Sequence, residues 1–115
     1  MAYFDPGSVI WELNSSDKYD AIREVIYRAP VFTEHDSLEL DEFTQIVIDR
    51  EKLQSTGFGH GVAVAHGRTD QVSEPTIALG ISHEGIDFES VDGEPVHVLF
   101  IVANHLAHQM SYLHI

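Results

Sequence analysis

The chain has 115 residues, a length typical of one domain that buries its own core. It contains no cysteine, which excludes disulfides, thiolate nucleophiles and zinc sites built from cysteine. Nineteen acidic residues against six lysines and arginines give a formal charge of −13. This charge argues against a nucleic-acid-binding surface and leaves two interpretations open, attraction to a basic protein partner and solubility alone.

The first elements predicted along the chain are a short strand and a helix. Val9–Leu13 alternates apolar and polar residues, which indicates an edge strand. A helix follows, with Ser16 or Asp17 as its N-cap. Apolar side chains recur at helical spacing as far as Pro30, where the helix must stop.

A second helix is predicted to begin near Ser37. Leu40, Phe43 and Val47 recur at i, i+3 and i+7 and form its inward stripe. Arg50 falls on the same stripe near the C-terminal end, where a cation needs a partner. Two interpretations are equally open: a side chain that reaches a partner carboxylate, or an anion site, because a glycine-rich loop follows a few residues later.

Three strands and a last helix complete the predicted fold. The strands are Val62–His66, Glu74–Ser82 and Pro95–Ala103, with a hairpin-like segment at Gly85–Gly93. The last strand is apolar on both faces, which predicts a central strand covered on both sides. Asn104–Ile115 is predicted to be a helix. The fold class is therefore α/β, with a mixed β-sheet flanked by helices on both faces.

The whole chain, residues 1–115, is predicted to form this single domain. No apolar run approaches the roughly 20 residues that a membrane helix needs, and the N-terminus lacks a signal-peptide pattern. We therefore expect a cytoplasmic protein with no membrane insertion.

The segment Thr56–Arg68 concentrates glycines around His66, the last residue of a predicted strand. A histidine in this position is more often structural than catalytic, but its surroundings favour chemistry. The glycines allow the backbone N–H groups to form a concave surface that suits a phosphate, and Ser55 and Thr56 add hydroxyl donors. The segment lacks the Gly-Lys-Ser/Thr ending of a Walker motif and fails the dinucleotide fingerprint, so nucleotide binding is not indicated.

Several spaced motifs together resemble a known family. They read "DREKLQSTGFGHGVAVAHGR", "EPTIALGIS" and "GIDFESVDGEPVHVLFIVA", followed by a predicted helix that bears histidines. This pattern resembles enzyme IIA of the bacterial phosphoenolpyruvate-dependent sugar phosphotransferase system, in its fructose, mannitol and nitrogen-regulatory type. The resemblance covers the chain from about Ser16 to its end. It implies the phosphotransferase/anion transport protein-like fold and a phosphotransferase with a phosphohistidine intermediate.

The resemblance also implies roles for individual residues. His66 matches the histidine that accepts the phosphoryl group, and Arg50 matches the arginine that neutralises it. The second active-site histidine comes from the last helix, where His108 ranks first and His105 is the alternative. The implied phosphate-binding loop comprises Thr56, Gly57, Gly59, His60 and Gly61, with His60 at its variable position.

The implied donor is a histidine-containing phosphocarrier protein, and the implied acceptor is a sugar-specific enzyme IIB. The alternative is a regulatory, nitrogen-type protein whose phosphorylation state controls a protein partner without sugar transport. No cofactor is implied. The chain departs from the pattern at Ala65, where relatives usually carry proline, and at its C-terminus, because relatives continue past Ile115. A short C-terminus would leave an apolar edge and favour a homodimer.

A metal site is a third hypothesis, of a different class. His105 and His108 are three residues apart, and His60, His66 and His97 are further candidate ligands. No motif such as His-Glu-x-x-His is present, and the family resemblance already explains three of these histidines. We therefore predict no physiological metal.

Overall fold

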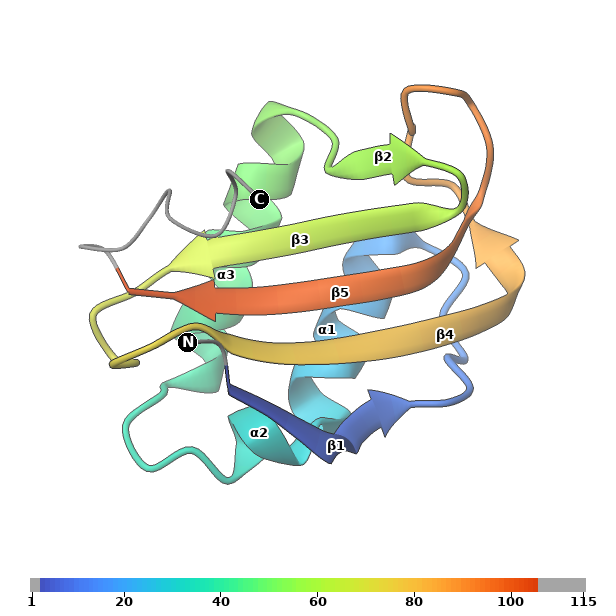
Figure 1. Cartoon of the computed structure of the whole chain (residues 1–115). Helices are drawn as coiled ribbons and strands as arrows, with labels where there is room; N and C mark the ends of the chain where they lie inside the picture. The colour runs from blue at the N-terminus through green and yellow to red at the C-terminus, as the bar shows by residue number, and fades with distance from the viewer. Residues whose placement is uncertain (1–2, 106–115) are drawn as a thin grey trace.

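The computed structural model describes residues 3–105, which form one five-stranded sheet with helices packed against it (Figure 1). The strand order is β1-β4-β5-β3-β2. The strands are β1 (Tyr3–Ile10), β2 (Gly57–Gly59), β3 (Val62–Arg68), β4 (Thr76–Ile86) and β5 (Val96–Asn104). The β1–β4 and β3–β5 pairs are parallel, and the β4–β5 and β2–β3 pairs are antiparallel. The predicted mixed sheet is confirmed, and β5 is its central strand as its two-sided apolar sequence indicated.

The helices begin where side chains can cap them. Helix α1 (Lys18–Arg28) starts after Asp17, whose carboxylate accepts hydrogen bonds from the backbone N–H groups of Tyr19 and Asp20 at 3.0 and 3.2 Å. Of the two predicted N-caps, the structure therefore uses Asp17. The predicted end of this helix at Pro30 coincides with the start of a separate short helix, α2 (Pro30–Thr33).

Helix α3 (Leu40–Leu53) begins three residues later than predicted. Its N-cap is Glu39, whose carboxylate accepts a hydrogen bond from the N–H of Asp41 at 3.0 Å. The predicted stripe holds, with Phe43 and Val47 fully buried and Leu40 partly buried.

The first strand differs from the prediction. Strand β1 ends at Ile10, whereas a strand was expected at Val9–Leu13. The chain leaves the sheet after Ile10, Trp11 is exposed, and Leu13 returns to the core with its N–H bound to the carbonyl of Ile81 at 2.8 Å. Alternation alone cannot distinguish this return from a continued strand.

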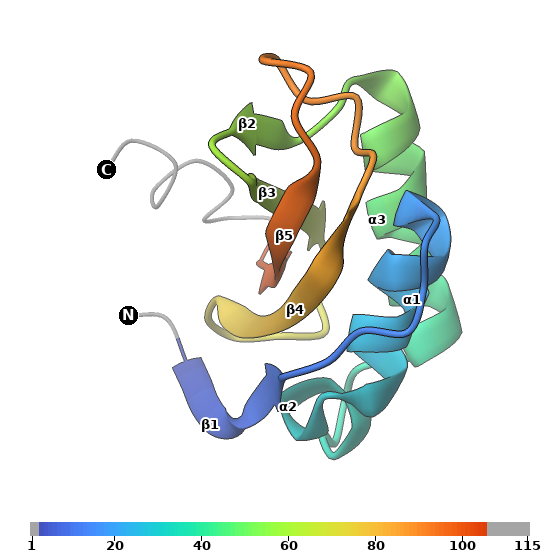
Figure 2. The ribbon, with the colours of Figure 1, turned by 90° about the vertical axis from the view of Figure 1, so that its right-hand side faces the viewer.

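All three described helices lie on one face of the sheet (Figure 2). The core fills the space between this face and the apolar stripes of α1 and α3. The helix expected on the second face was predicted at Asn104–Ile115; Asn104 ends β5, and residues 106–115 lie outside the described residues. The second face carries partly exposed side chains from three strands, among them Val64, His66 and Phe100.

The contact between β3 and α3 is close because Gly67 has no side chain. A Cβ atom at Gly67 would lie 2.9 Å from the Cγ2 atoms of both Ile46 and Val47 and 3.1 Å from a ring carbon of Phe43. The absence of a side chain at Gly67 therefore sets the distance between the strand that carries His66 and the helix beside it.

We expect Gly67→Ala to lower the free energy of unfolding by about 1–3 kcal/mol, because the added methyl group overpacks this contact. Urea denaturation measures the change. The control is Arg68→Ala at the next, exposed position, for which a change within about 0.5 kcal/mol is expected. Equal stability of Gly67→Ala and the unmodified protein would contradict the tight spacing.

Candidate functional site

His66 lies in the second half of β3, on the face of the sheet opposite the described helices. The inner face of β3 is made by Ala63, Ala65 and Gly67, which are buried, and His66 alternates with them. Its Nδ1 atom lies 3.3 Å from the carbonyl oxygen of Val64. A carbonyl can only accept, so this contact requires a proton on Nδ1. In the neutral ring with this tautomer, the free lone pair is on Nε2.

The environment of His66 favours the neutral ring. Its pKa is lowered from the ordinary value of 6.5, chiefly because partial burial penalises the charged form. The hydrogen bond to Val64 opposes this shift. Arg50 and Arg68 lower the pKa further through their positive charges, while Glu51 raises it. At neutral pH the ring is therefore unprotonated at Nε2 and able to attack an electrophile.

Arg50 occupies the last turn of α3 and is partly exposed. One of its guanidinium nitrogens, Nη1, donates to the carbonyl oxygen of Gln54 at 2.8 Å. Within residues 3–105 the guanidinium makes no salt bridge with a carboxylate. This arrangement favours the anion-site interpretation over the partner-carboxylate interpretation, because the charge is available to a ligand.

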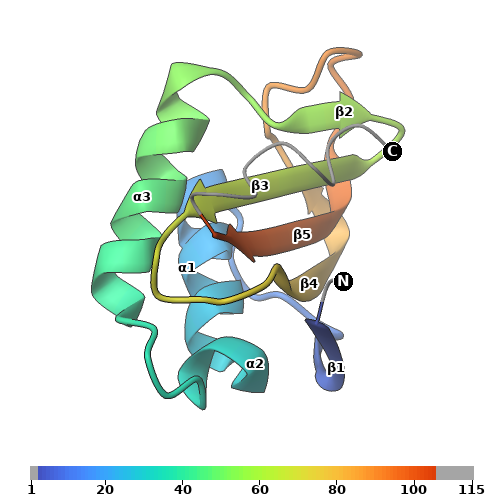
Figure 3. The same cartoon turned by 60° about the vertical axis from the view of Figure 1, so that its left-hand side comes forward.

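The glycine-rich segment folds as a tight hairpin between β2 and β3. His60 and Gly61 form its turn with φ values of 58° and 80°, the positive values that a type I′ turn requires at both positions. The N–H of His60 donates to the carboxylate of Asp92 at 2.9 Å. The β2–β3 turn lies at the start of β3, at the end opposite its arrowhead (Figures 1 and 3). His66 is the fifth residue of this strand, four residues or about 13 Å beyond Val62, the residue that follows the turn. The structure therefore does not bring the turn residues His60 and Gly61 to the ring of His66.

Thr56 contacts β3 beyond its pairing with β2, at Val64, two residues before His66. Its carbonyl oxygen accepts a hydrogen bond from the N–H of Val64 at 3.2 Å. The hydroxyl group of Thr56, which we expected to donate to a phosphate, donates instead to Glu51 at 2.5 Å. Ser55 is likewise engaged, since its hydroxyl group donates to the carbonyl of Phe88.

Glu51 is a buried charged residue to which the sequence pattern assigned no role. It receives the hydrogen bonds of Thr56 and lies 3.4 Å from the ammonium group of Lys18. The sequence contains one signal for it: Glu51 follows Phe43 and Val47 at successive intervals of four, on the buried stripe of α3.

The alternative second histidine, His105, follows the end of β5. It lines a pocket of about 340 Å³ together with side chains that include His35 and Asp70. His66 is not among the residues that line this pocket. The first-ranked candidate, His108, lies outside the described residues.

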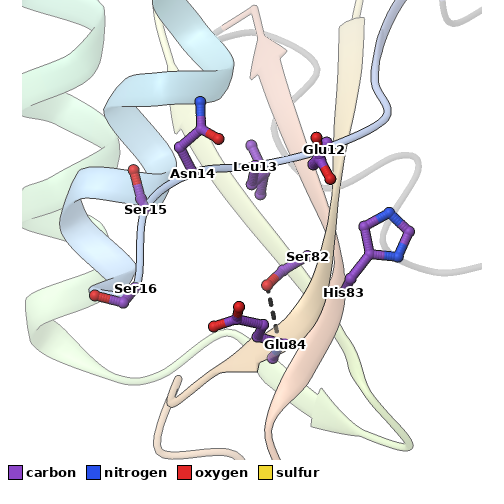
Figure 4. A pocket seen from close by; sticks show the side chains of 9 residues that line it. Glu12, Leu13, Asn14, Ser15, Ser16, Ser82, His83 and Glu84 are labelled. Carbon is purple, nitrogen blue, oxygen red and sulfur yellow. Dashed lines mark hydrogen bonds between the residues drawn. The ribbon is translucent and has the colours of Figure 1, made fainter.

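A second pocket, of about 300 Å³, contains none of the predicted site residues (Figure 4). It lies between the β1–α1 connection and the end of β4, and Ser82 on its wall accepts a hydrogen bond from the N–H of Gly85 at 3.0 Å. Within the part of the chain described here, no three histidine, aspartate or glutamate side chains are grouped so as to hold a metal ion. Residues 3–105 also contain no helix long and apolar enough to cross a membrane.

Comparisons with known proteins relate the sequence and the fold of this chain to one family. The sequence model of the family described as "Phosphoenolpyruvate-dependent sugar phosphotransferase system, EIIA 2" matches residues 2–115. The fructose-specific EIIABC component of Bacillus subtilis is 43% identical over 61 residues, which are 53% of this chain and 10% of that protein. The aligned part of this chain spans less than two thirds of the length of the curated relatives that it matches first.

Two solved structures have similar folds. The nitrogen regulatory protein IIA-Ntr of Neisseria meningitidis superimposes with a TM-score of 0.82 at 28% identity, over 96% of this chain and 74% of that one. The mannitol enzyme IIA of Escherichia coli, solved in complex with phosphorylated enzyme IIB, gives a TM-score of 0.77 at 21% identity, over 99% of this chain and 78% of that one.

We expect the ring of His66 to titrate below pH 6.5, because burial and the nearby arginines disfavour its charged form. An NMR pH titration of the ring, assigned by comparison with His66→Gln, measures the midpoint. Between the folded and unfolded pKa values the folded state binds fewer protons, so the free energy of unfolding falls as the pH decreases through this window. His66→Gln should lack that part of the pH dependence. A titration midpoint at or above pH 6.5 would contradict the predicted lowering of the His66 pKa by burial and the nearby arginines.

Proposed function

The chain belongs to the EIIA 2 family of the phosphoenolpyruvate-dependent sugar phosphotransferase system, and we propose that it carries a phosphoryl group on Nε2 of His66. The observation that supports the acceptor atom is the contact of Nδ1 with the carbonyl of Val64, which leaves the lone pair on Nε2. The lowered pKa of His66 keeps this atom unprotonated at neutral pH.

The proposed step moves one phosphoryl group between two imidazole rings. The Nε2 lone pair of His66 forms a bond to phosphorus while the bond between phosphorus and the donor's ring nitrogen breaks. The electron pair of the broken bond returns to the donor nitrogen. Nδ1 of His66 keeps its proton, held by Val64, so the phosphorylated ring becomes positively charged and no proton is gained or lost. The transition state spreads negative charge over three oxygens.

Arg50 supplies positive charge for this step. Among residues 3–105 its guanidinium group makes one hydrogen bond, to Gln54, so other N–H donors could bind phosphoryl oxygens. Catalysis in this scheme consists of positioning and electrostatic stabilisation, which requires no cofactor.

The proposed donor is a histidine-containing phosphocarrier protein, and the proposed acceptor is an enzyme IIB. The formal charge of −13 favours docking of a partner that presents positive charge. The mannitol enzyme IIA of Escherichia coli was solved with phosphorylated enzyme IIB, which supports a partner of the same kind here. We also propose a cytoplasmic location for the protein. The predicted homodimer can be tested by analytical ultracentrifugation.

A regulatory role is the second candidate. It is favoured by the similarity to the nitrogen regulatory protein IIA-Ntr, which has the higher TM-score of the two structures compared above. In this role the phosphoryl group on His66 would control a protein partner instead of passing to a sugar. Transfer from the phosphorylated chain to an enzyme IIB in vitro distinguishes the two roles.

Phosphorylation by the general components of the phosphotransferase system tests the carrier function. We expect one acid-labile phosphoryl group per chain by mass spectrometry, absent in His66→Ala, because no other group would be the acceptor. His83→Ala, at an exposed position on β4, is the control and should be labelled like the unmodified protein. A folded chain that takes no label, or a His66→Ala variant that takes a full one, would overturn the proposal.

The position of the second histidine is tested by two alanine variants. We place it at His108 and keep His105 as the alternative, because His105 lines a pocket that does not include His66. We expect His108→Ala to lower the rate of phosphoryl transfer at least about tenfold through lost charge stabilisation. His105→Ala should stay within about twofold. The reverse order in single-turnover measurements would assign the role to His105.

A further inference from the structure

Glu51 is a deeply buried carboxylate near His66. Its described contacts are with Thr56, at the start of the glycine-rich segment, and with Lys18, at the start of α1. Glu51 is 2% exposed. Its carboxylate accepts from the Thr56 backbone N–H at 3.1 Å and from the Thr56 hydroxyl at 2.5 Å. A buried carboxylate is stable only when its oxygens are satisfied in this way.

Lys18 holds the other side of this carboxylate. Its ammonium group lies 3.4 Å from Glu51 and 2.8 Å from Glu89, and the residue is only 7% exposed. Lys18 therefore links the start of α1 to Glu51 near the end of α3 and to Glu89 in the segment after β4. The Lys18 ammonium group thus places a positive charge beside the buried carboxylate of Glu51.

Thr56 is connected to His66 by two hydrogen bonds, through Val64. The carbonyl of Thr56 accepts from the N–H of Val64, and the carbonyl of Val64 accepts from Nδ1 of His66. Strand β2 pairs only with the first two residues of β3, so Thr56 is the last described backbone contact on this edge before His66. The orientation of the ring therefore depends on where Glu51 holds Thr56.

We propose that Glu51 is a positioning residue for phosphoryl transfer at His66, acting through Thr56 and Val64 and anchored by Lys18. This inference rests on the proposed phosphoryl-carrier function. The negative charge of Glu51 also favours the positively charged His66 ring that phosphorylation creates. Glu51 need not touch the phosphoryl group, because its carboxylate is fully engaged inside the protein.

The test compares Glu51→Gln and Thr56→Val with the unmodified chain. Glu51→Gln removes the charge at constant size, and Thr56→Val removes the hydroxyl without disturbing the Lys18–Glu51 pair. We expect each to lower the single-turnover rate at saturating phosphorylated phosphocarrier protein by about 10- to 100-fold, with little change in the half-saturating concentration. Thr56→Ser, which keeps the hydroxyl group, should restore most of the rate.

The NMR signal of the His66 ring provides a readout independent of any phosphoryl donor. Glu51→Gln should move its titration midpoint to lower pH, because a negative charge that favours the protonated ring is lost. The control is Asp49→Asn, which removes an exposed carboxylate from the same helix and should change neither the rate nor the midpoint.

The outcomes separate this inference from the proposed function. If the unmodified chain takes no phosphoryl group, the carrier function is overturned, while the NMR comparison still decides whether Glu51 acts on the ring. If the chain is phosphorylated and folded Glu51→Gln and Thr56→Val match it in rate and midpoint, the positioning role is overturned. A loss in Thr56→Ser equal to that in Thr56→Val would also overturn it.

Discussion

Helix α3 and strand β3 lie close together because the inner face of β3 carries only small residues. Ala63, Ala65 and Gly67 are buried on that face, and even a methyl group at Gly67 would collide with side chains of the helix. The close approach brings the last turn of α3, including Arg50, to the edge of β3 where His66 lies. A larger side chain on this face would move the helix outward, and the charges that act on the histidine would move with it. The electrostatics of the site therefore depend on an apolar packing contact.

Strand pairing and packing also hold the backbone at Ala65, the position where the resemblance to the enzyme IIA pattern implies a proline. Ala65 is fully buried within β3, and its register partner on β5 is Ile101. On the other edge of the strand, Thr56 binds the N–H of Val64. The backbone on both sides of the residue is thus held by strand pairing and by packing against α3. A proline ring would restrict φ at a position where these contacts already determine the conformation.

Much of the fold could be predicted from local patterns, and the parts that could not depend on long-range contacts. The central place of β5 follows from its two-sided apolar sequence, and Asp17 and Pro30 mark helix ends by their own chemistry. Glycine spacing, by contrast, shows that backbone freedom is needed but not for what purpose. In the structure it serves the His60–Gly61 turn, at the far end of β3 from His66. The role of Glu51 was hidden for a related reason, since Lys18 and Glu51 are 33 positions apart in the sequence.

Arg50 and Glu51 are neighbours in sequence with opposite charges, and the helix directs them to different places. Successive residues of an α-helix are turned by about 100°, so Glu51 lies in the interior while Arg50 stays at the partly exposed rim. In the proposed transfer, each charge acts on a different part of the reaction. Burial and the charge of Arg50 lower the pKa of the His66 ring and so favour its neutral form, and the proposal gives Arg50 the further role of neutralising the phosphoryl oxygens. The proposed role of Glu51 is to favour the positively charged ring that phosphorylation would create. Exchanging the two residues would put an arginine next to Lys18 and a glutamate beside the proposed phosphoryl group. Both contacts would then be between like charges, so the site requires arginine at position 50 and glutamate at position 51.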